Sequence, residues 1–186
     1  MPLSSGVSPR CISRLVPVTA GTAFRFHSAR FLITHSPMRE IVKYSGCFVC
    51  GEQNPIGLKV HFYADGEEAV AECVADPQFQ GYRNIFHGGV VSALLDEIMA
   101  KAILAKQIYP LTAEMTVRFK KAVPTGERLF LKGRITARRG RMFETAGELA
   151  GSSGEIFAHA TGKYIEAADP MRDALLESLE EGSNPQ

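Results

Sequence analysis

The sequence has no long hydrophobic run and almost no excess of charge. No apolar stretch in its 186 residues approaches the roughly 20 that a membrane-spanning helix needs. The formal net charge is only +1, which provides no general attraction for nucleic acid or for a membrane surface. We therefore expect neither as a partner, and any site for an anion must come from local clustering of cations.

Cysteine is also scarce, with four residues: Cys11, Cys47, Cys50 and Cys73. This number is too small for a disulfide scaffold in a chain of this length, so a reducing compartment and a cytoplasmic location are favoured. Cys47 and Cys50 have the spacing of a zinc knuckle, and a structural zinc needs four ligands, which His61 and Cys73 could complete. The interpretation we favour is a turn with two buried thiols, so we expect no metal and no cofactor.

Acidic residues and lysine are missing from residues 1–39, where arginine and serine are frequent. This composition is typical of an organelle transit peptide, which would make the protein mitochondrial. The alternative is a start at Met38, where ordinary composition begins, and we favour this alternative slightly. On both interpretations residues 1–38 form an extension outside the folded domain.

One helix dominates the rest of the chain, from about residue 88 to residue 106. Its apolar residues point in almost every direction around the axis, which is typical of a helix buried on most sides. Alternating patterns predict strands on both sides of it, at residues 58–63, 69–75, 112–120, 129–135, 142–149 and 156–165. An antiparallel sheet wrapped around a central helix describes few folds, and the hotdog fold, of the α+β class, is the first of them.

The domain boundaries follow from this pattern. We expect the hotdog domain to span residues 39–168, followed by a short helix and tail at residues 169–186. Asp169 is predicted to be the N-cap of that helix, with Pro170 at its first position.

His87, Gly88 and Gly89 stand where the long helix begins. Glycines there leave the first backbone N–H groups unobstructed, and the N-terminus of a helix favours negative charge. The segment could therefore act as an oxyanion hole for a thioester carbonyl. The alternative is a tight turn into a packed helix, for which glycine is also suited.

Two carboxylates lie in the middle of the helix, and their surroundings differ. Glu97 has Lys101 four residues further on, which predicts an ordinary exposed ion pair. Asp96 has no cation among its neighbours on the helix face, and an unpaired carboxylate on an apolar face is costly unless it has a function. The alternative is that Asp96 only contacts water or the hydroxyl of a strand residue.

The pattern His87-Gly88-Gly89, six residues and then Asp96 resembles the motif of the acyl-CoA thioesterases of the hotdog superfamily, of the phenylacetyl-CoA thioesterase or PaaI-like type. The similarity includes residues 80–82 and 112–121 and extends over about residues 45–166. It implies hydrolysis of an acyl-CoA, without a cofactor.

The same resemblance implies the roles of individual residues. Asp96 would be the base or nucleophile, the N–H of Gly88 would polarise the thioester carbonyl with His87 beside it, and Thr112 would hold the attacking water. Gly89 would contact the substrate. Some members of the family have an asparagine six residues before the histidine; Gly81 occupies that position here, and Asn84 is the candidate to replace it.

Helix geometry predicts a dimer. Gly88 and Asp96 are separated by about 12 Å along one helix, at about 1.5 Å per residue, so one thioester carbon cannot contact both. The site must combine Gly88 of one subunit with Asp96 of another. We expect a homodimer with a shared active site, with a tetramer as a further option.

Three arginines, Arg138, Arg139 and Arg141, surround Gly140 at a predicted hairpin turn. Guanidinium groups bind phosphate oxygens through two parallel N–H groups, so this turn is a candidate clamp for the phosphates of CoA. The alternative is a solvated turn.

Two other functions remain open on the same fold. One is a hydratase or dehydratase, although we do not find the loop motif that places the histidine of such enzymes. The other is an acyl-CoA-binding protein without enzymatic activity, against which the carboxylate on the central helix argues.

Overall fold

The computed structural model describes residues 38–179. Except for Met38, the predicted N-terminal extension lies outside the described residues, as do residues 180–186 of the predicted tail. Within the described part of the chain, no helix is long and apolar enough to cross a membrane.

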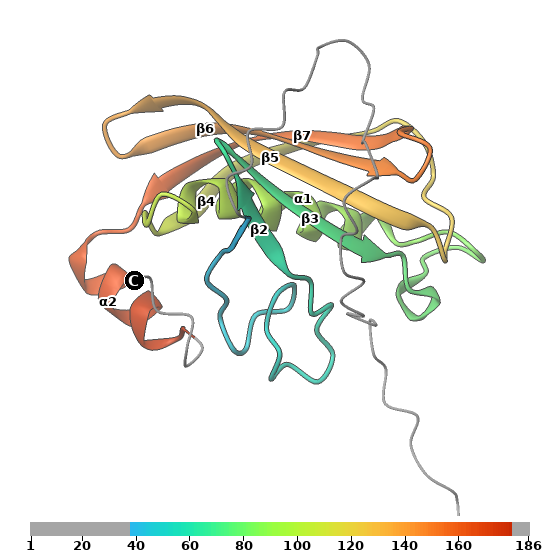
Figure 1. Cartoon of the computed structure of the whole chain (residues 1–186), viewed down its shortest axis with the longest axis horizontal. Helices are drawn as coiled ribbons and strands as arrows, with labels where there is room; N and C mark the ends of the chain where they lie inside the picture. The colour runs from blue at the N-terminus through green and yellow to red at the C-terminus, as the bar shows by residue number, and fades with distance from the viewer. Residues whose placement is uncertain (1–37, 180–186) are drawn as a thin grey trace, which may run out of the picture.

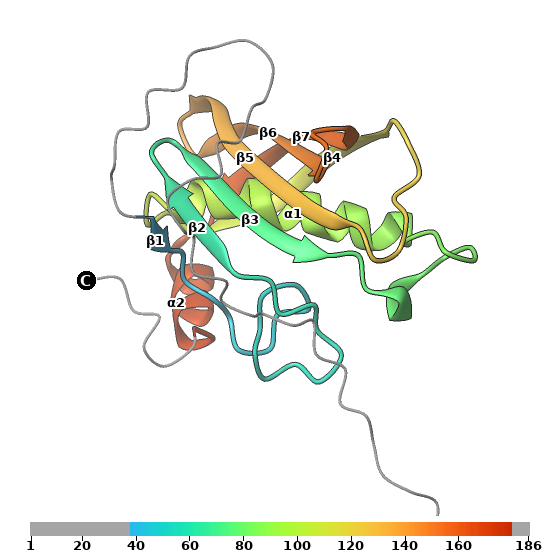
Figure 2. The same cartoon turned by 45° about the vertical axis from the view of Figure 1, so that its right-hand side comes forward.

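The described residues form one curved sheet and one long helix. The elements in chain order are β1 (Arg39–Glu40), β2 (Phe62–Asp65), β3 (Glu68–Val74), the 3-10 helix η1 (Pro77–Phe79), α1 (Gly88–Leu104), β4 (Pro110–Phe119), β5 (Arg128–Arg139), β6 (Met142–Gly151), β7 (Ile156–Glu166) and α2 (Asp169–Glu177). The 7-stranded sheet has the order β1-β2-β3-β5-β6-β7-β4, and all neighbouring strands are antiparallel. In Figures 1 and 2 this sheet curves around α1, which confirms the predicted hotdog fold.

Helix α1 is buried because its apolar side chains meet the concave face of the sheet. Leu94, Leu95, Ile98 and Met99 are all 0% exposed. The closest approach is at Gly133 of β5, where an added Cβ would lie 2.4 Å from the carbonyl oxygen of Ile98. The absence of a side chain at Gly133 therefore lets the helix backbone touch the sheet.

Strand β4 forms one edge of the sheet and packs against α1. It pairs with β7 on one side only, and most of its residues are exposed. Thr112 lies near its start and Phe119 at its end. Phe119 is a large apolar side chain that is 55% exposed.

Two local predictions were wrong. The strand predicted for residues 58–63 is β2 and begins only at Phe62, because Leu58 and Val60 donate their N–H groups to the carbonyls of Phe48 and Val49. The N-cap of α2 is Ala168 rather than Asp169, which lies in the first turn with Pro170 and forms an ion pair with Arg172 instead.

Candidate active site

The start of α1 is capped by the side chain of His87. Its Nδ1 accepts a hydrogen bond from the N–H of Gly89 at 2.8 Å, and its carbonyl accepts from Val90 and Val91. Within residues 38–179, the N–H of Gly88 has no acceptor. The expectation of several free N–H groups therefore holds for Gly88 and not for Gly89, whose N–H is used to begin the helix.

The loop before the helix folds back as a small hairpin in which Gln80 bridges Phe86. Gly81 lies against the imidazole, since a Cβ there would be 3.0 Å from Cδ2 of His87. Asn84 lies at the turn, with a φ of 61° and its N–H donated to Gln80 Oε1 at 3.1 Å. Among the described residues, Asn84 has no hydrogen bond to His87 or Gly88, so it does not replace an amide at position 81 in this conformation.

Asp96 receives two hydroxyl donors on the same carboxylate oxygen. Thr112 Oγ1 donates to Asp96 Oδ1 at 2.9 Å, and the Tyr164 hydroxyl donates to Oδ1 at 2.8 Å and to the Asp96 carbonyl at 3.1 Å. In the described part of the chain, Oδ2 has no donor. The carboxylate is thus held through one oxygen, and the other remains available.

Thr112 was predicted from the sequence and Tyr164 was not. Tyr164 faces Thr112 across the β4–β7 ladder and is 0% exposed. Burial, followed by the negative charge of Asp96, raises the pKa of Tyr164, so its hydroxyl stays protonated and donates. The alternative in which Asp96 contacts a strand hydroxyl is therefore realised, but as part of an ordered group of three residues.

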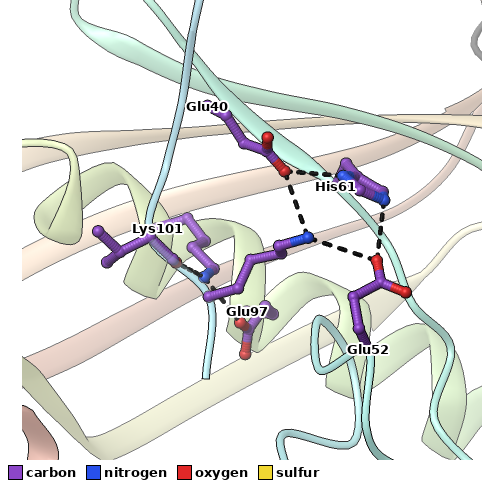
Figure 3. A network of polar contacts seen from close by, with 7 residues as sticks. Glu40, Glu52, His61, Glu97 and Lys101 are labelled. Atoms are coloured by element: carbon purple, nitrogen blue, oxygen red, sulfur yellow. Dashed lines mark hydrogen bonds and ion pairs between the residues drawn. The ribbon is translucent and has the colours of Figure 1, made fainter. Parts of the chain in front are cut away.

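The Glu97–Lys101 pair is not exposed, contrary to the prediction. Lys101 is 0% exposed, its Nζ lies 3.5 Å from Glu97 Oε1, and it also donates to the carbonyl of Val42 (Figure 3). The rings of Tyr44 and Phe62 lie 5.9 and 5.6 Å from the ammonium group. The prediction failed because the segment before β2 folds over this face of α1.

That segment also carries Cys47 and Cys50, whose side chains lie next to Glu97 of α1. Cys47 Sγ, Cys50 Sγ and a Glu97 carboxylate oxygen all lie within 4.8 Å of one another. A hydrogen bond from the Cys50 thiol lowers the pKa of Cys47 to about 7. The two residues that could have completed a zinc site lie elsewhere: His61 contacts Glu40 and Glu52 (Figure 3), and Cys73 is not part of the group.

The arginine turn between β5 and β6 is mostly bound to its own chain. Arg138 forms an ion pair with Glu166 at 3.2 Å and lies over the ring of Phe143, and Arg141 donates to the carbonyl of Glu166 at 3.2 Å. Arg139 is exposed and has no partner within residues 38–179. The expected cluster of three available guanidinium groups therefore reduces to one.

Residues 83–156, from the loop before α1 to the start of β7, match the family model of the thioesterase superfamily. No curated protein matches the chain significantly. The family match agrees with the fold described above.

Three solved structures illustrate the similarity. A thioesterase superfamily protein superposes with a TM-score of 0.62 at 24% identity, over 66% of this chain and 61% of its own length. PaaI of E. coli, from the phenylacetic acid degradation operon, has a TM-score of 0.56 at 17% identity, over 59% of this chain and 80% of its own. A hypothetical thioesterase with coenzyme A from Streptococcus pneumoniae has a TM-score of 0.53 at 17% identity, over 54% of this chain and 82% of its own.

This chain spans less than two thirds of the first of these structures, and at such identities the structures establish the fold. They confirm the predicted hotdog fold, and the family match over residues 83–156 adds a similarity to the thioesterase superfamily, which includes proteins of the PaaI-like type.

Proposed function

We propose that this protein hydrolyses the thioester of an acyl-CoA. The observation that carries the proposal is the arrangement of Asp96, whose Oδ1 is held by Thr112 and Tyr164 while Oδ2 has no donor within the described residues. A carboxylate fixed in this way can act on a water or on an electrophile in one defined direction.

The reaction needs one group that promotes attack on the thioester carbon and another that stabilises the negative charge on the carbonyl oxygen. Asp96 takes a proton from a water that attacks the thioester carbon, or attacks that carbon itself with water completing the hydrolysis. The carbonyl oxygen becomes negative in the transition state and accepts a hydrogen bond from the N–H of Gly88. Collapse breaks the carbon–sulfur bond, and the products are a free acid and the protonated thiol of CoA.

His87 has a supporting role in this scheme. Its ring accepts the N–H of Gly89 and so fixes the first turn of α1, which sets the direction of the Gly88 N–H. Gly89 therefore contributes through the helix cap and through close approach to the substrate rather than as a second oxyanion donor.

The proposed active site is shared between two subunits. Gly88 and Asp96 are about 12 Å apart along α1, so each thioester takes Gly88 from one chain and Asp96 from the other. The exposed edge strand β4 connects both ends of this site, since Thr112 contacts Asp96 and the ring of Phe119 lies 3.5 Å from where a Gly88 Cβ would be. A homodimer, with a tetramer as a further option, would cover this strand.

Arg139 is the residue we assign to a phosphate of CoA. In the sheet, Arg138 pairs with Phe143, and Phe143 pairs with Tyr164. Because Tyr164 contacts Asp96, the arginine turn lies near the Asp96 end of the proposed site. Arg138 and Arg141 would support this turn through Glu166. The Streptococcus pneumoniae thioesterase of the same fold was crystallised with coenzyme A, which supports a CoA ester as the substrate class.

The test is thiol release from a panel of acyl-CoA esters by the wild-type protein and by Asp96→Asn. We expect Asp96→Asn to lower kcat by about 10²–10⁴, because a positioned base or nucleophile is lost. Glu148→Gln, an exposed carboxylate on β6, is the matched control and should retain wild-type activity.

Three outcomes separate the candidate functions. Thiol release that depends on Asp96 supports hydrolysis. Loss of a conjugated double bond without thiol release would indicate a hydratase, and saturable binding of acyl-CoA with no reaction would indicate a sensor. Either of these last two results would overturn the proposal.

A further inference from the structure

We propose that Cys47, Cys50 and Glu97 form a zinc site, with water as the fourth ligand, that attaches the segment before β2 to helix α1. This site lies outside the proposed thioesterase chemistry and does not depend on it. It also differs from the expectation drawn from the sequence. There we favoured a turn without a metal, and His61 and Cys73 were the residues that could have completed a zinc site.

The three ligand atoms are already close enough to surround one ion. They lie within 4.8 Å of one another and belong to side chains that are buried or partly buried. Zinc–sulfur bonds of about 2.3 Å and zinc–oxygen bonds of about 2.0–2.2 Å place the ligands of a tetrahedral site roughly 3.5–3.8 Å apart. Small rotations of the three side chains are therefore sufficient, without movement of the backbone.

The turn that carries the cysteines is built around the Cys47 sulfur. Sγ of Cys47 accepts hydrogen bonds from the N–H groups of Val49 at 3.3 Å and Cys50 at 3.4 Å, so two backbone donors fix the position of this sulfur. The turn closes at Gly51, where a Cβ would lie 2.4 Å from the carbonyl of Ser45. Only glycine fits there, so the turn can close against the backbone that precedes Cys47.

The charges around the two cysteines are compatible with a bound zinc ion. The carboxylate of Glu97 faces the cysteines, and Cys47 Sγ lies 3.8 Å from Oε2. Lys101, fully buried and 3.5 Å from Glu97, already balances that carboxylate. Exchange of two thiol protons for one Zn²⁺ leaves the total charge of the group unchanged, so binding does not leave an unpaired buried charge.

The ligand set selects the type of metal. Two thiolates are soft ligands that favour zinc over magnesium or calcium, which prefer oxygen. Glu97 is the residue after Asp96 on α1, so the ion would connect the covering segment to the helix that carries the proposed catalytic carboxylate. The ion would stabilise the fold, because it binds the folded chain and the unfolded chain has no preformed site.

The experiment uses the full chain, produced with added zinc and purified in the presence of a reductant without a chelator. Elemental analysis should find about one zinc per chain, and replacement by Co²⁺ should give the near-ultraviolet absorption of thiolate-to-cobalt charge transfer. Cys47→Ser and Cys50→Ser should lose both signals, and Glu97→Gln should bind zinc more weakly. Cys73→Ser is the matched control and should retain both. A strong chelator should lower the Tm of the wild type but not that of Cys47→Ser.

Three results would overturn the zinc site. The first is a wild-type protein that holds no zinc and shows no charge-transfer band after incubation with excess zinc or cobalt. The second is retention of zinc by a folded Cys47→Ser, Cys50→Ser double variant. The third is a Cys47–Cys50 disulfide in the protein purified with reductant. The first and third are measured on the wild type, so they decide the question even where a variant fails to fold, and none of them affects the thiol-release assay.

Discussion

At the scale of single residues, the two oxygens of the Asp96 carboxylate have different surroundings. Two hydroxyl groups donate hydrogen bonds to one oxygen of the carboxylate, so its orientation is fixed without a cation. In the proposed mechanism, Tyr164 is therefore a positioning residue that acts through Asp96.

We expect Tyr164→Phe to lower kcat by about 10-fold with little change in KM, because one hydrogen bond to a charged group is lost while Thr112 still holds the carboxylate. Steady-state kinetics measure kcat and KM separately.

A matched comparison for Tyr164→Phe is Phe143→Leu, which disturbs the neighbouring core position of β6 without removing a hydroxyl group. That variant should lose stability but keep the kcat of the wild type. If both variants lower kcat equally, Tyr164 only fills the core.

The sequence indicates part of this site because local patterns carry it. His87, Gly88 and Asp96 lie within one helix and the residue that caps it, and Thr112 belongs to a strand with clear alternation. Tyr164 has no local signal: a tyrosine in a strand is expected to fill the core, and only the β4–β7 register places it beside Thr112.

The Glu97–Lys101 prediction failed for a related reason. The spacing of four residues identifies a pair, but it does not show which face of the helix is later covered by another segment.

At the scale of elements, the packing of α1 on the sheet depends on glycines of the strands beneath it. The long helix and six of the seven strands were predictable in order from periodicity, because a helix that is apolar all round requires a sheet around it. The two-residue strand β1 was not predicted. The start of β2 was not predictable, because Leu58 and Val60 form hydrogen bonds to the turn that carries Cys47 and Cys50 rather than to a strand. The contact at Gly133 also has no signal in the local pattern.

Gly133→Ala should destabilise the protein by about 1–3 kcal/mol, because the new methyl group meets the helix backbone at Ile98 and the backbone cannot move away easily. Urea unfolding of the purified protein gives the free energy directly. Gly147→Ala should have a smaller effect, since its neighbour is the flexible side chain of Met99 at 2.9 Å.

Gly46→Ala is the control for this pair, because no atom lies within 4 Å of its added Cβ. Its unfolding free energy should be close to that of the wild type. An equal loss in Gly133→Ala and Gly46→Ala would show that the helix does not rest on the sheet at Gly133.

At the scale of the whole molecule, the separation of Gly88 from Asp96 makes the proposed chemistry a property of the assembly. One helix carries both ends of the site at about 12 Å, and β4 runs exposed between them. In a two-fold symmetric dimer with the helices side by side and antiparallel, each Gly88 would face the partner's Asp96, so a dimer would contain two complete sites. A monomer would contain none.

The donor at Gly88 can be removed without removal of the helix. Gly88 is the first residue of α1, where proline is favoured, and His87 before it is extended with φ −66° and ψ 130°, as a residue before proline requires. Gly88→Pro therefore deletes one N–H and should lower kcat by about 10²–10³, the usual effect of losing an oxyanion donor. Gly88→Ala keeps the N–H and is its control.

These two kinds of variant test the shared site when they are combined. Gly88→Pro and Asp96→Asn are each inactive alone, but a mixed dimer has one site with both defects and one site with neither. Coexpression in equal amounts yields half mixed dimers by random pairing, so about one quarter of wild-type activity should return. Differently tagged chains allow the mixed dimer to be purified, and its activity should approach half of the wild type. If every site lay within one chain, the mixed dimer would remain as inactive as its parents, and the pairing of Gly88 with the partner's carboxylate would be wrong.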